Sequence, residues 1–509
     1  MVEIEQLTEE NKQLKAENHQ LRLKVQALEM TQIKAILQDD ERQQQLHIEY
    51  TQAIEEVEEK SQDNESDEGK PPPKPRAKRK KKRLSPDKKF AHIPVKKTTV
   101  LIPKEVKNNP ELWEKVGETK HFELVVNPAT VHRHEIIQEK YRCKADRDAP
   151  LIKATAPVRF SSSYVSISLA VYIAITKYLE HNPLYRQEQI FRRMGVDIPR
   201  QTQSDIVEQM AQWFRPLYEY IELTTKQSKY LLIDETFIKY INGKNKGVGQ
   251  GYFWAYYAPD GNMVLKWILD RKHKNVDELI DGFEGLLQSD GYDAYNNYAK
   301  AHDDIILLAC WAHTFGKFRD AFGDEPVHSK GMLHEIGALY KLEQKWDEEN
   351  VTPQQRKQLR LECSMPIVET IKTKLDAYSV DFSIPNNGFR TAVNYALGQW
   401  PALLRCFDYG YTKLDTNLLE VQFRPKKVGL KNYLFIGHPL AGEKSAIIYT
   451  LLSCCTLHRI HPWDYLNDAL QKLIKAPQSG PTEKLLQELL PQNWAKANPD
   501  KIIKELHQA

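Results

Sequence analysis

The sequence predicts an α/β core with a long, mostly helical insertion, preceded by a parallel coiled coil, a small β-rich module and a helix-turn-helix-like region. Three observations predict this fold class. Heptad spacing covers residues 4–28. From residue 229 onward, apolar and amphipathic segments follow in the order β-β-β-α-β-α-β, which is typical of a mixed sheet with helices on its faces. Residues 314–405 then show mostly helical patterning.

Residues 1–38 are predicted to form a dimerisation helix. Every d position of the heptads is Leu and two a positions are Asn; the seam consists of Ile4, Leu7, Asn11, Leu14, Asn18, Leu21, Val25 and Leu28. Buried Asn side chains pair best in a two-stranded parallel coiled coil. We therefore expect a homodimer, and a helix that packs on its own chain is the less favoured alternative.

Residues 39–89 are expected to be a disordered linker, because like charges are gathered into blocks. Residues 39–68 have a net charge of −10 and residues 70–89 a net charge of +10, whereas the whole chain has a net charge of +3. The basic block contains Lys78, Arg79, Lys80, Lys81, Lys82 and Arg83. An arm that contacts DNA phosphates and a solubilising linker explain this composition equally well.

Residues 90–160 are predicted to form a small β-rich module, with strands in "HFELVV" and "HEIIQEKYRC". Cys143 has no partner in a CxxC pair, so the residues do not favour a zinc site.

Residues 161–225 are predicted to be helical and to contain a helix-turn-helix-like pair. A break at residues 195–199 separates two helices, the second of which is expected to begin at Thr202 or Ser204. Four side chains around this break are candidates for DNA contacts, namely Arg192, Arg193, Arg200 and Gln201. Helical hairpins that bind nothing share the pattern, so the spacing alone leaves both readings open.

Residues 226–436 are predicted to carry the chemistry, because acids follow two apolar strands. Asp234 ends the run "LLID" and Asp290 ends the run "LLQSD". Carboxylates on neighbouring strands repel each other unless a cation lies between them, and oxygen ligands suit Mg²⁺ or Mn²⁺. Glu420 is the candidate third ligand of a two-metal site, and Arg424 on the same helix face is placed to bind a phosphate. Capping and turn formation are the structural alternatives for such acids.

Four blocks of sequence resemble the DDE-type transposases of the insertion-sequence-66 family, namely "LLIDETF", "LQSDGYDAY", "CWAHTFGKF" and "NLLEVQFRPKKVGLKNYLF". The resemblance implies a ribonuclease-H-like core in which Asp234, Asp290 and Glu420 are the catalytic, metal-binding acids. The zinc module of the family is incomplete here, because Asp146 stands where the partner of Cys143 would be. Zinc is therefore not expected. The resemblance implies two Mg²⁺ or Mn²⁺ ions, held by the three catalytic acids.

Four further residues are second-tier candidates near the site: Glu235, Arg424, His313 and Cys310. Cys310 and His313 have a CxxH spacing, but packing under the sheet is favoured over metal ligation because a structural zinc needs two more ligands. Residues 437–509 are expected to form a C-terminal helical region.

The function that the resemblance implies is DNA transposition. The protein would bind the terminal inverted repeats of its element through residues 90–222, cleave a DNA strand and join the freed 3′-OH to target DNA. Small accessory proteins of the same element are further partners that the family implies. A catalytically inactive, transposase-derived DNA-binding protein and a ribonuclease-H-like nuclease are the alternatives. Six scattered cysteines and no apolar run long enough to cross a membrane favour a cytoplasmic protein. The resemblance implies a bacterial protein that works at the nucleoid.

Overall fold

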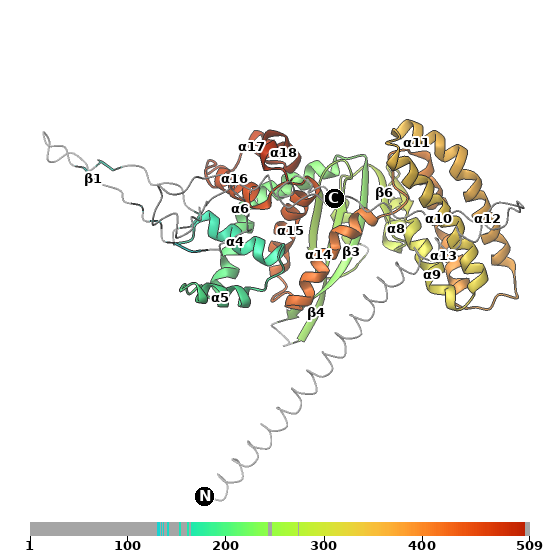
Figure 1. Cartoon of the computed structure of the whole chain (residues 1–509), viewed down its shortest axis with the longest axis horizontal. Helices are drawn as coiled ribbons and strands as arrows, with labels where there is room; N and C mark the ends of the chain where they lie inside the picture. The colour runs from blue at the N-terminus through green and yellow to red at the C-terminus, as the bar shows by residue number, and fades with distance from the viewer. Residues whose placement is uncertain are drawn as a thin grey trace, which may run out of the picture. The chain divides into compact units, whose positions relative to one another are not determined.

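The computed structural model describes residues 164–503 except 243–246 and 273, together with a few short stretches between residues 130 and 161 (Figure 1). The expected coiled coil (1–38), the linker (39–89) with its basic arm and most of the module at 90–160 lie outside the described residues. Within that module, strand β1 (Lys140–Tyr141) pairs antiparallel with β2 (Ile152–Lys153).

Three helices precede the sheet: α4 (Ile167–Tyr178), α5 (Leu184–Arg193) and α6 (Arg200–Lys226). Ser166 caps α4, because its hydroxyl accepts a hydrogen bond from the Leu169 amide at 3.1 Å. Pro183 and Pro199 stand directly before α5 and α6. The expectation that the second helix begins at Thr202 or Ser204 is wrong by a few residues, because the helix continues back to the residue after Pro199. The helix–break–helix arrangement itself is present.

The centre of the molecule is a five-stranded mixed sheet with the strand order β5-β4-β3-β6-β7. Its strands are β3 (Tyr230–Asn242), β4 (Gly247–Tyr257), β5 (Met263–Ile268), β6 (Gly285–Ser289) and β7 (Ile305–Ala309). Strands β3, β4 and β5 form an antiparallel meander, whereas β6 is parallel to both β3 and β7. Helix α7 (Lys274–Ile280) precedes β6 and α8 (Asp293–Ala301) precedes β7, so the elements follow in the expected order. Helix α7 is shorter than the amphipathic segment expected from residue 275, because its last residues belong to β6.

Helices cover the sheet at both ends of the strand order (Figure 1). Helices α6 and α15 (Ala441–Leu457) pack against β5. Residues 444–455 of α15 are all buried. Helix α8 packs against β7. The C-terminal helices α16 (Pro462–Ile474), α17 (Glu483–Leu489) and α18 (Pro491–Ala497) pack near α4, α6 and α15.

Between β7 and α14 (Asn417–Tyr433) the chain forms a group of helices, which Figure 1 shows beside β6 and α8. They are α9 (Trp311–Asp320), α10 (Pro326–Glu348), α11 (Pro353–Leu359), α12 (Met365–Val380) and α13 (Gly388–Arg405). Helix α13 packs on both β7 and α9, so it joins this group to the sheet.

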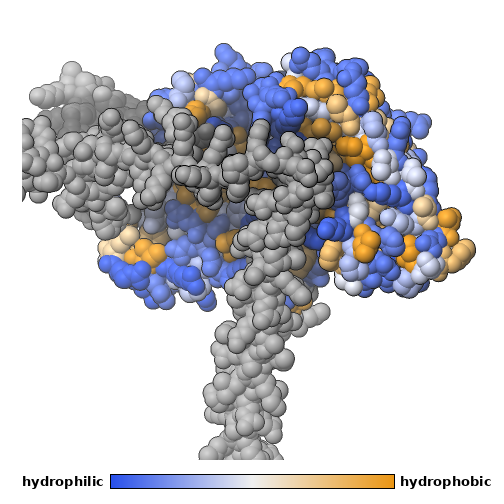
Figure 2. All heavy atoms as spheres, turned by 45° about the vertical axis from the view of Figure 1, so that its right-hand side comes forward, coloured by the Kyte–Doolittle hydropathy of each residue, from blue (hydrophilic) through white to orange (hydrophobic). Residues whose placement is uncertain are grey.

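The surface mixes polar and apolar side chains. Figure 2 shows hydrophilic atoms over much of the face that it presents, with apolar atoms in separate patches. Strongly exposed apolar residues in the segment from α10 to α13 include Val327, Val380 and Phe382. Across residues 164–503, no helix combines the length and the apolar character that crossing a membrane requires.

Candidate active site

Asp234 lies where a fully buried apolar run gives way to polar residues. Residues 231–233 have no exposed surface, and Asp234 follows them on β3. The strand does not end there as expected. It continues to Asn242, because β4 pairs with it from Leu232 opposite Tyr257 to Asn242 opposite Gly247. What ends near Asp234 is the neighbouring strand β6, whose pairing with β3 stops at Leu232 opposite Gln288.

The register of the parallel pair places Asp290 level with Asp234. Both acids stand two residues beyond the last paired position, Leu232 opposite Gln288. Adjacent strands lie about 4.8 Å apart, and residues of the same parity point to the same face. The Asp290 carboxylate accepts a hydrogen bond from the Tyr292 amide at 3.0 Å, which closes a tight turn into α8. The observed pairing therefore places the two acids at the same level on neighbouring strands.

Gly291 in this turn is required by a close neighbour rather than by an unusual backbone conformation. A Cβ at this position would lie 2.5 Å from the ring of Tyr395, which belongs to α13. No side chain fits at that distance, so the turn after Asp290 and helix α13 can approach only because the residue is glycine.

Glu420 reaches the same region from the first turn of α14. Helix α14 packs along β3. At its far end, the Ile436 amide donates to the Lys239 carbonyl at 2.9 Å and the Ile241 amide donates to the Ile436 carbonyl at 2.9 Å. From Tyr240 back to Asp234 and from Tyr433 back to Glu420 the chain spans about 20 Å in each case. Glu420 is therefore close to the level of Asp234.

The segment before α14 is anchored to the start of α9. The Trp311 amide donates to the Leu414 carbonyl at 2.9 Å, and the amide and hydroxyl of Thr416 both lie 3.5 Å from the Cys310 sulfur. Asp415 accepts from the Asn417 amide at 3.0 Å, which fixes the first turn of the helix. Cys310 is fully buried, and burial raises its pKa to about 12. Its neutral thiol packs against the segment that leads into α14.

The negative charges of neighbouring acids act on Asp234. Burial, together with the negative charges of Glu235, Asp290 and Glu420, raises the pKa of Asp234 to about 8. The Glu235 amide donates to the Asp234 carboxylate at 2.8 Å and opposes this rise in part. Like charges gathered in a poorly hydrated place are the electrostatic signature of a cation site.

The carboxylate oxygens match the ligands that Mg²⁺ and Mn²⁺ prefer. In the described part of the chain, however, no group of three or more His, Cys, Asp and Glu side chains is arranged so that it could hold a metal ion. The three acids therefore lie in one region and influence one another electrostatically. Their side chains are not arranged around a common point as the ligands of a metal ion would be.

Glu235 has its own counter-charges and is not free to act as a further ligand. It forms an ion pair with Arg271 and accepts a hydrogen bond from the Tyr295 hydroxyl at 2.7 Å. The Arg271 guanidinium in turn lies 3.9 Å from the centre of the Tyr292 ring. Burial still raises the pKa of Glu235, although the Tyr295 hydrogen bond and Arg271 oppose the rise. This residue joins the site to α8 and to the segment after β5.

His313 and Arg424 lie at the open side of the site. The His313 Nε2 atom is 3.8 Å from the nearer Glu420 oxygen, and both side chains are about one third exposed. His313 Nδ1 is buried and has no hydrogen-bond partner among the described residues. Arg424 is exposed one turn after Glu420 on the same face of α14.

The four candidates for DNA contacts differ in their surroundings. Arg192 is neutralised by Glu188 at 2.7 Å and by Asp197 at 3.3 Å. Arg193 lines a polar groove. Arg200 and Gln201 line a separate cavity, where Gln201 donates to Asp205 at 2.9 Å. The basic arm at residues 78–83 lies outside the described residues.

Sequence reasoning missed three side chains that shape the site: Arg271, Tyr295 and Tyr395. Each comes from an element that carries no acid of the predicted triad. Tyr295 stands inside the block "LQSDGYDAY", one turn into the helix that follows Asp290, which is the one signal that pointed to it.

Comparison with known proteins identifies the family. A family model described as "Transposase IS66 family" matches residues 162–444, which is more than half of the chain. The chain belongs to this transposase family. Membership confirms the resemblance drawn from the four sequence blocks, and it indicates a DNA-cleaving enzyme in general terms that binds DNA.

Three relatives come from Sinorhizobium fredii (strain NBRC 101917 / NGR234). The uncharacterized protein y4jD is 27% identical over 75% of this chain and 76% of its own length. The uncharacterized protein y4qI is 29% identical over 76% of this chain and 72% of its own length. The uncharacterized protein y4hP is 23% identical over 76% of this chain and 73% of its own length. The likeness therefore extends well beyond the segment that contains the three acids.

Proposed function

We propose that this transposase cleaves DNA strands at the ends of its element and joins the freed 3′-OH groups to target DNA, with Asp234, Asp290 and Glu420 as the catalytic acids. The observation that carries the proposal is the pKa of Asp234, which burial and three neighbouring acids raise to about 8. A carboxylate with no cation of its own beside Asp290 and Glu420 is unfavourable for stability alone. Such an arrangement is expected where a divalent cation is bound during function.

The strand order supports a ribonuclease-H-like core. Three antiparallel strands are followed by two parallel strands on the other side of β3, with a helix before each of the two. In this arrangement the first acid lies on the central strand and the second directly after its parallel neighbour.

The three acids would hold Mg²⁺ or Mn²⁺, in a two-ion site, through their oxygens. When bound, such ions make a water or a 3′-OH nucleophilic and stabilise the leaving oxygen of the phosphodiester. Arg424, one turn from Glu420, would bind a non-bridging phosphate oxygen and orient the strand. His313, when protonated, would donate to the Glu420 carboxylate and fix its direction toward Asp234. Arg271 would hold the Glu235 carboxylate beside the site and offset part of its charge, which otherwise adds to the field of Asp290 and Glu420 at Asp234.

The remaining parts of the proposal concern assembly. We expect residues 90–222 to recognise the terminal inverted repeats, the basic arm at 78–83 to add phosphate contacts, and residues 1–38 to pair two copies of the chain at the nucleoid. Small accessory proteins of the same element are further candidate partners.

The test is strand cleavage and joining by the full chain on a duplex of the element end in the presence of Mg²⁺. Wild-type protein should nick the end and join its 3′-OH to a second duplex. The substitutions Asp234→Asn, Asp290→Asn and Glu420→Gln should each reduce nicking by roughly a thousandfold or more, because each removes a charged ligand.

Asp376→Asn is the matched control, since Asp376 forms a surface ion pair with Lys372 on α12 far along the chain from the triad. Binding of the end duplex without any nicking by the wild-type chain would support an inactive DNA-binding protein instead. Cleavage that follows DNA structure, without preference for the element end and without joining, would support a ribonuclease-H-like nuclease.

A further inference from the structure

Helix α14 carries a continuous stripe that begins at the candidate active site. Glu420, Arg424, Lys427 and Lys431 are spaced by four, three and four residues, which places them on one face of the helix. The three basic residues are exposed, whereas Leu419, Phe423, Lys426 and Gly429 on the other face are buried. Neither Arg424 nor Lys427 forms an ion pair with another residue of the described part of the chain. The stripe therefore offers positive charge to a partner.

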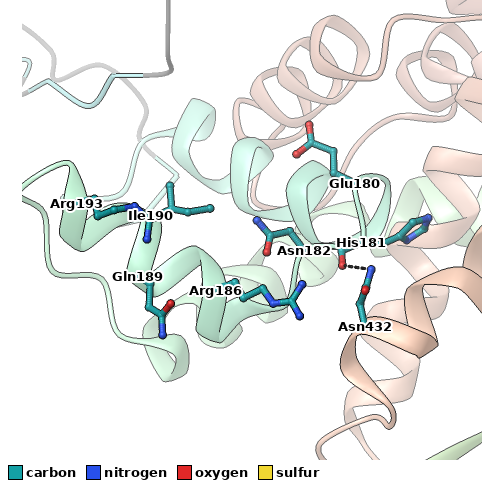
Figure 3. A pocket seen from close by; sticks show the side chains of 8 residues that line it. All are labelled: Glu180, His181, Asn182, Arg186, Gln189, Ile190, Arg193 and Asn432. Carbon is teal, nitrogen blue, oxygen red and sulfur yellow. Dashed lines mark hydrogen bonds between the residues drawn. The ribbon is translucent and has the colours of Figure 1, made fainter. Parts of the chain in front are cut away.

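A polar groove lies between α5 and the C-terminal part of α14, where Asn432 follows Lys431 in the chain. The groove has a volume of about 460 Å³ and is lined by Glu180, His181, Asn182, Arg186, Gln189, Ile190, Arg193 and Asn432. Arg186, Gln189, Ile190 and Arg193 are spaced by three, one and three residues, so they form one face of α5. Figure 3 shows the Arg186 guanidinium extending from α5 toward Asn432 on α14.

Close packing builds the wall of this groove. His181 adopts a positive φ of 57°, and its carbonyl accepts a hydrogen bond from the Asn432 side chain at 3.1 Å. A Cβ on Gly429 would lie 2.8 Å from His181 Nδ1 and 2.7 Å from the Tyr433 hydroxyl. The loop before α5 therefore approaches α14 only because position 429 is glycine, which fixes the two helices relative to each other.

The charges in the groove favour an anion. Arg186 donates to the Tyr185 hydroxyl at 3.0 Å, but neither Arg186 nor Arg193 forms an ion pair with a described residue. Three amide side chains, those of Asn182, Gln189 and Asn432, supply further hydrogen-bonding groups. Glu180 is the one acid of the lining, and Figure 3 shows its carboxylate turned away from Arg186. Arginines with neighbouring amides are the groups that recognise phosphate oxygens.

We propose that the groove between α5 and α14 binds the phosphate backbone of the DNA strand whose scissile phosphate lies at the acids, and that the basic stripe of α14 guides the strand between the two places. This inference rests on the proposed function for its substrate. Glu420 and Asn432 are separated by about 18 Å along the helix, and Arg186 and Arg193 by about 10 Å along α5. At about 3.4 Å per nucleotide, the groove would hold phosphates about five to eight nucleotides from the scissile one.

The experiment is a scan with single neutral methylphosphonates, placed one at a time along each strand of an element-end duplex. Binding and nicking are measured for the wild-type full chain and for a variant with both Arg186→Ala and Arg193→Ala. Lys372→Ala is the control, because Lys372 is a partly exposed basic residue of α12, outside residues 90–222, and is already paired with Asp376.

We expect one methylphosphonate position about five to eight nucleotides from the nick to weaken wild-type binding by about tenfold, the value of one lost charge-assisted contact. The same change should have no effect on the double variant, whose salt dependence of binding should fall by about two phosphate contacts. The Lys372→Ala chain should keep the wild-type profile.

A double variant that keeps the wild-type profile would overturn the groove as a DNA site. So would a wild-type profile without a sensitive position in that interval, because the groove would then serve another anion. Failure of the proposed function looks different. In that case the wild-type chain does not nick the duplex in Mg²⁺, while the binding scan still reports whether the groove holds phosphates.

Discussion

Two groups of charges in this protein, one buried and one half-buried, are built on opposite plans. Among the helices that follow β7, Arg360 is fully buried and donates to Glu343 at 2.7 and 2.9 Å. Arg356 donates to the same carboxylate at 2.7 Å and to Asp347 at 2.5 Å. On β3, by contrast, Asp234 faces Glu235, Asp290 and Glu420, and no basic side chain among the described residues neutralises it. Opposite charges are matched in the first group, and like charges are gathered in the second.

The matched group serves the fold. Arg360 also donates to the carbonyls of Cys406 and Thr412 at 2.8 Å each, in the segment that leads to α14. Its hydrogen bonds thus fix the chain just before the helix that carries Glu420. The like-charged group, in contrast, lowers the stability of the fold. The difference teaches that the helices after β7 supply the rigidity that the acids themselves cannot supply.

The largest expected effect is the loss of the matched group. Arg360→Met leaves Glu343 buried with one arginine fewer, and it frees the three carbonyls that Arg360 binds, those of Cys406, Tyr409 and Thr412. We expect the free energy of unfolding to fall by about 3–5 kcal/mol, the usual result when one partner of a buried ion pair is removed. Urea denaturation followed by tryptophan fluorescence measures it. Arg192→Ala, which breaks an exposed ion pair, should cost less than about 1 kcal/mol, and equal losses in the two variants would contradict the comparison.

The opposite sign is expected at the like-charged group. Asp234→Asn replaces a carboxylate that must take up a proton to stay buried, so in the presence of a chelator the free energy of unfolding at pH 7 should rise by a few kcal/mol. One pK unit corresponds to about 1.4 kcal/mol, and burial raises the pKa of Asp234 to about 8. The same denaturation assay measures the change. Destabilisation by Asp234→Asn would show that this carboxylate contributes to the fold like Glu343.

Much of the like-charged group could be predicted from the sequence, because its signal is local. An apolar run that ends in an acid is visible in "LLID" and in "LLQSD", and the strand order of a mixed sheet brings such ends together. The length of β3 could not be predicted, since whether residues after Asp234 stay in the sheet depends on the partner strand β4. Thr236 and Ile238 are buried by that pairing, and nothing in their own sequence requires it.

The matched group could not be predicted at all. Arg356 and Arg360 read as ordinary helix-surface residues, and their partners Glu343 and Asp347 lie on another helix. The same limit applies to Arg192 and Arg193, which are adjacent and equivalent in the sequence. Only the fold shows that Arg192 faces Glu188 and Asp197 while Arg193 faces the groove. Pairing between side chains depends on the packing of whole helices, which residue patterns leave open.

The smallest effect sharpens the comparison with a single buried charge. Burial lowers the pKa of Lys426 to about 7, and its ammonium group donates to Ser453 at 2.7 Å without an acidic partner. Between pH values of about 7 and 10.5, the ordinary lysine pKa, the unfolded chain binds a proton at Lys426 that the folded chain does not. Stability should therefore rise with pH from about 7 to about 10, because the proton excess is in the unfolded state.

Lys426→Met should flatten this rise, and thermal unfolding of the two chains across the interval measures it. Lys427→Met is the matched control, because Lys427 is exposed on the next position of the helix and its substitution should leave the slope unchanged. A wild-type slope that persists in Lys426→Met would assign the pH dependence to another group.

The most direct test of the central claim, that three acids far apart in the sequence form one cation site, is the binding of Mn²⁺ by the full-length chain, measured by electron paramagnetic resonance. The wild-type chain should bind Mn²⁺ in competition with Mg²⁺, and Asp234→Asn, Asp290→Asn and Glu420→Gln should each weaken that binding. Undiminished Mn²⁺ binding in all three variants would contradict the account.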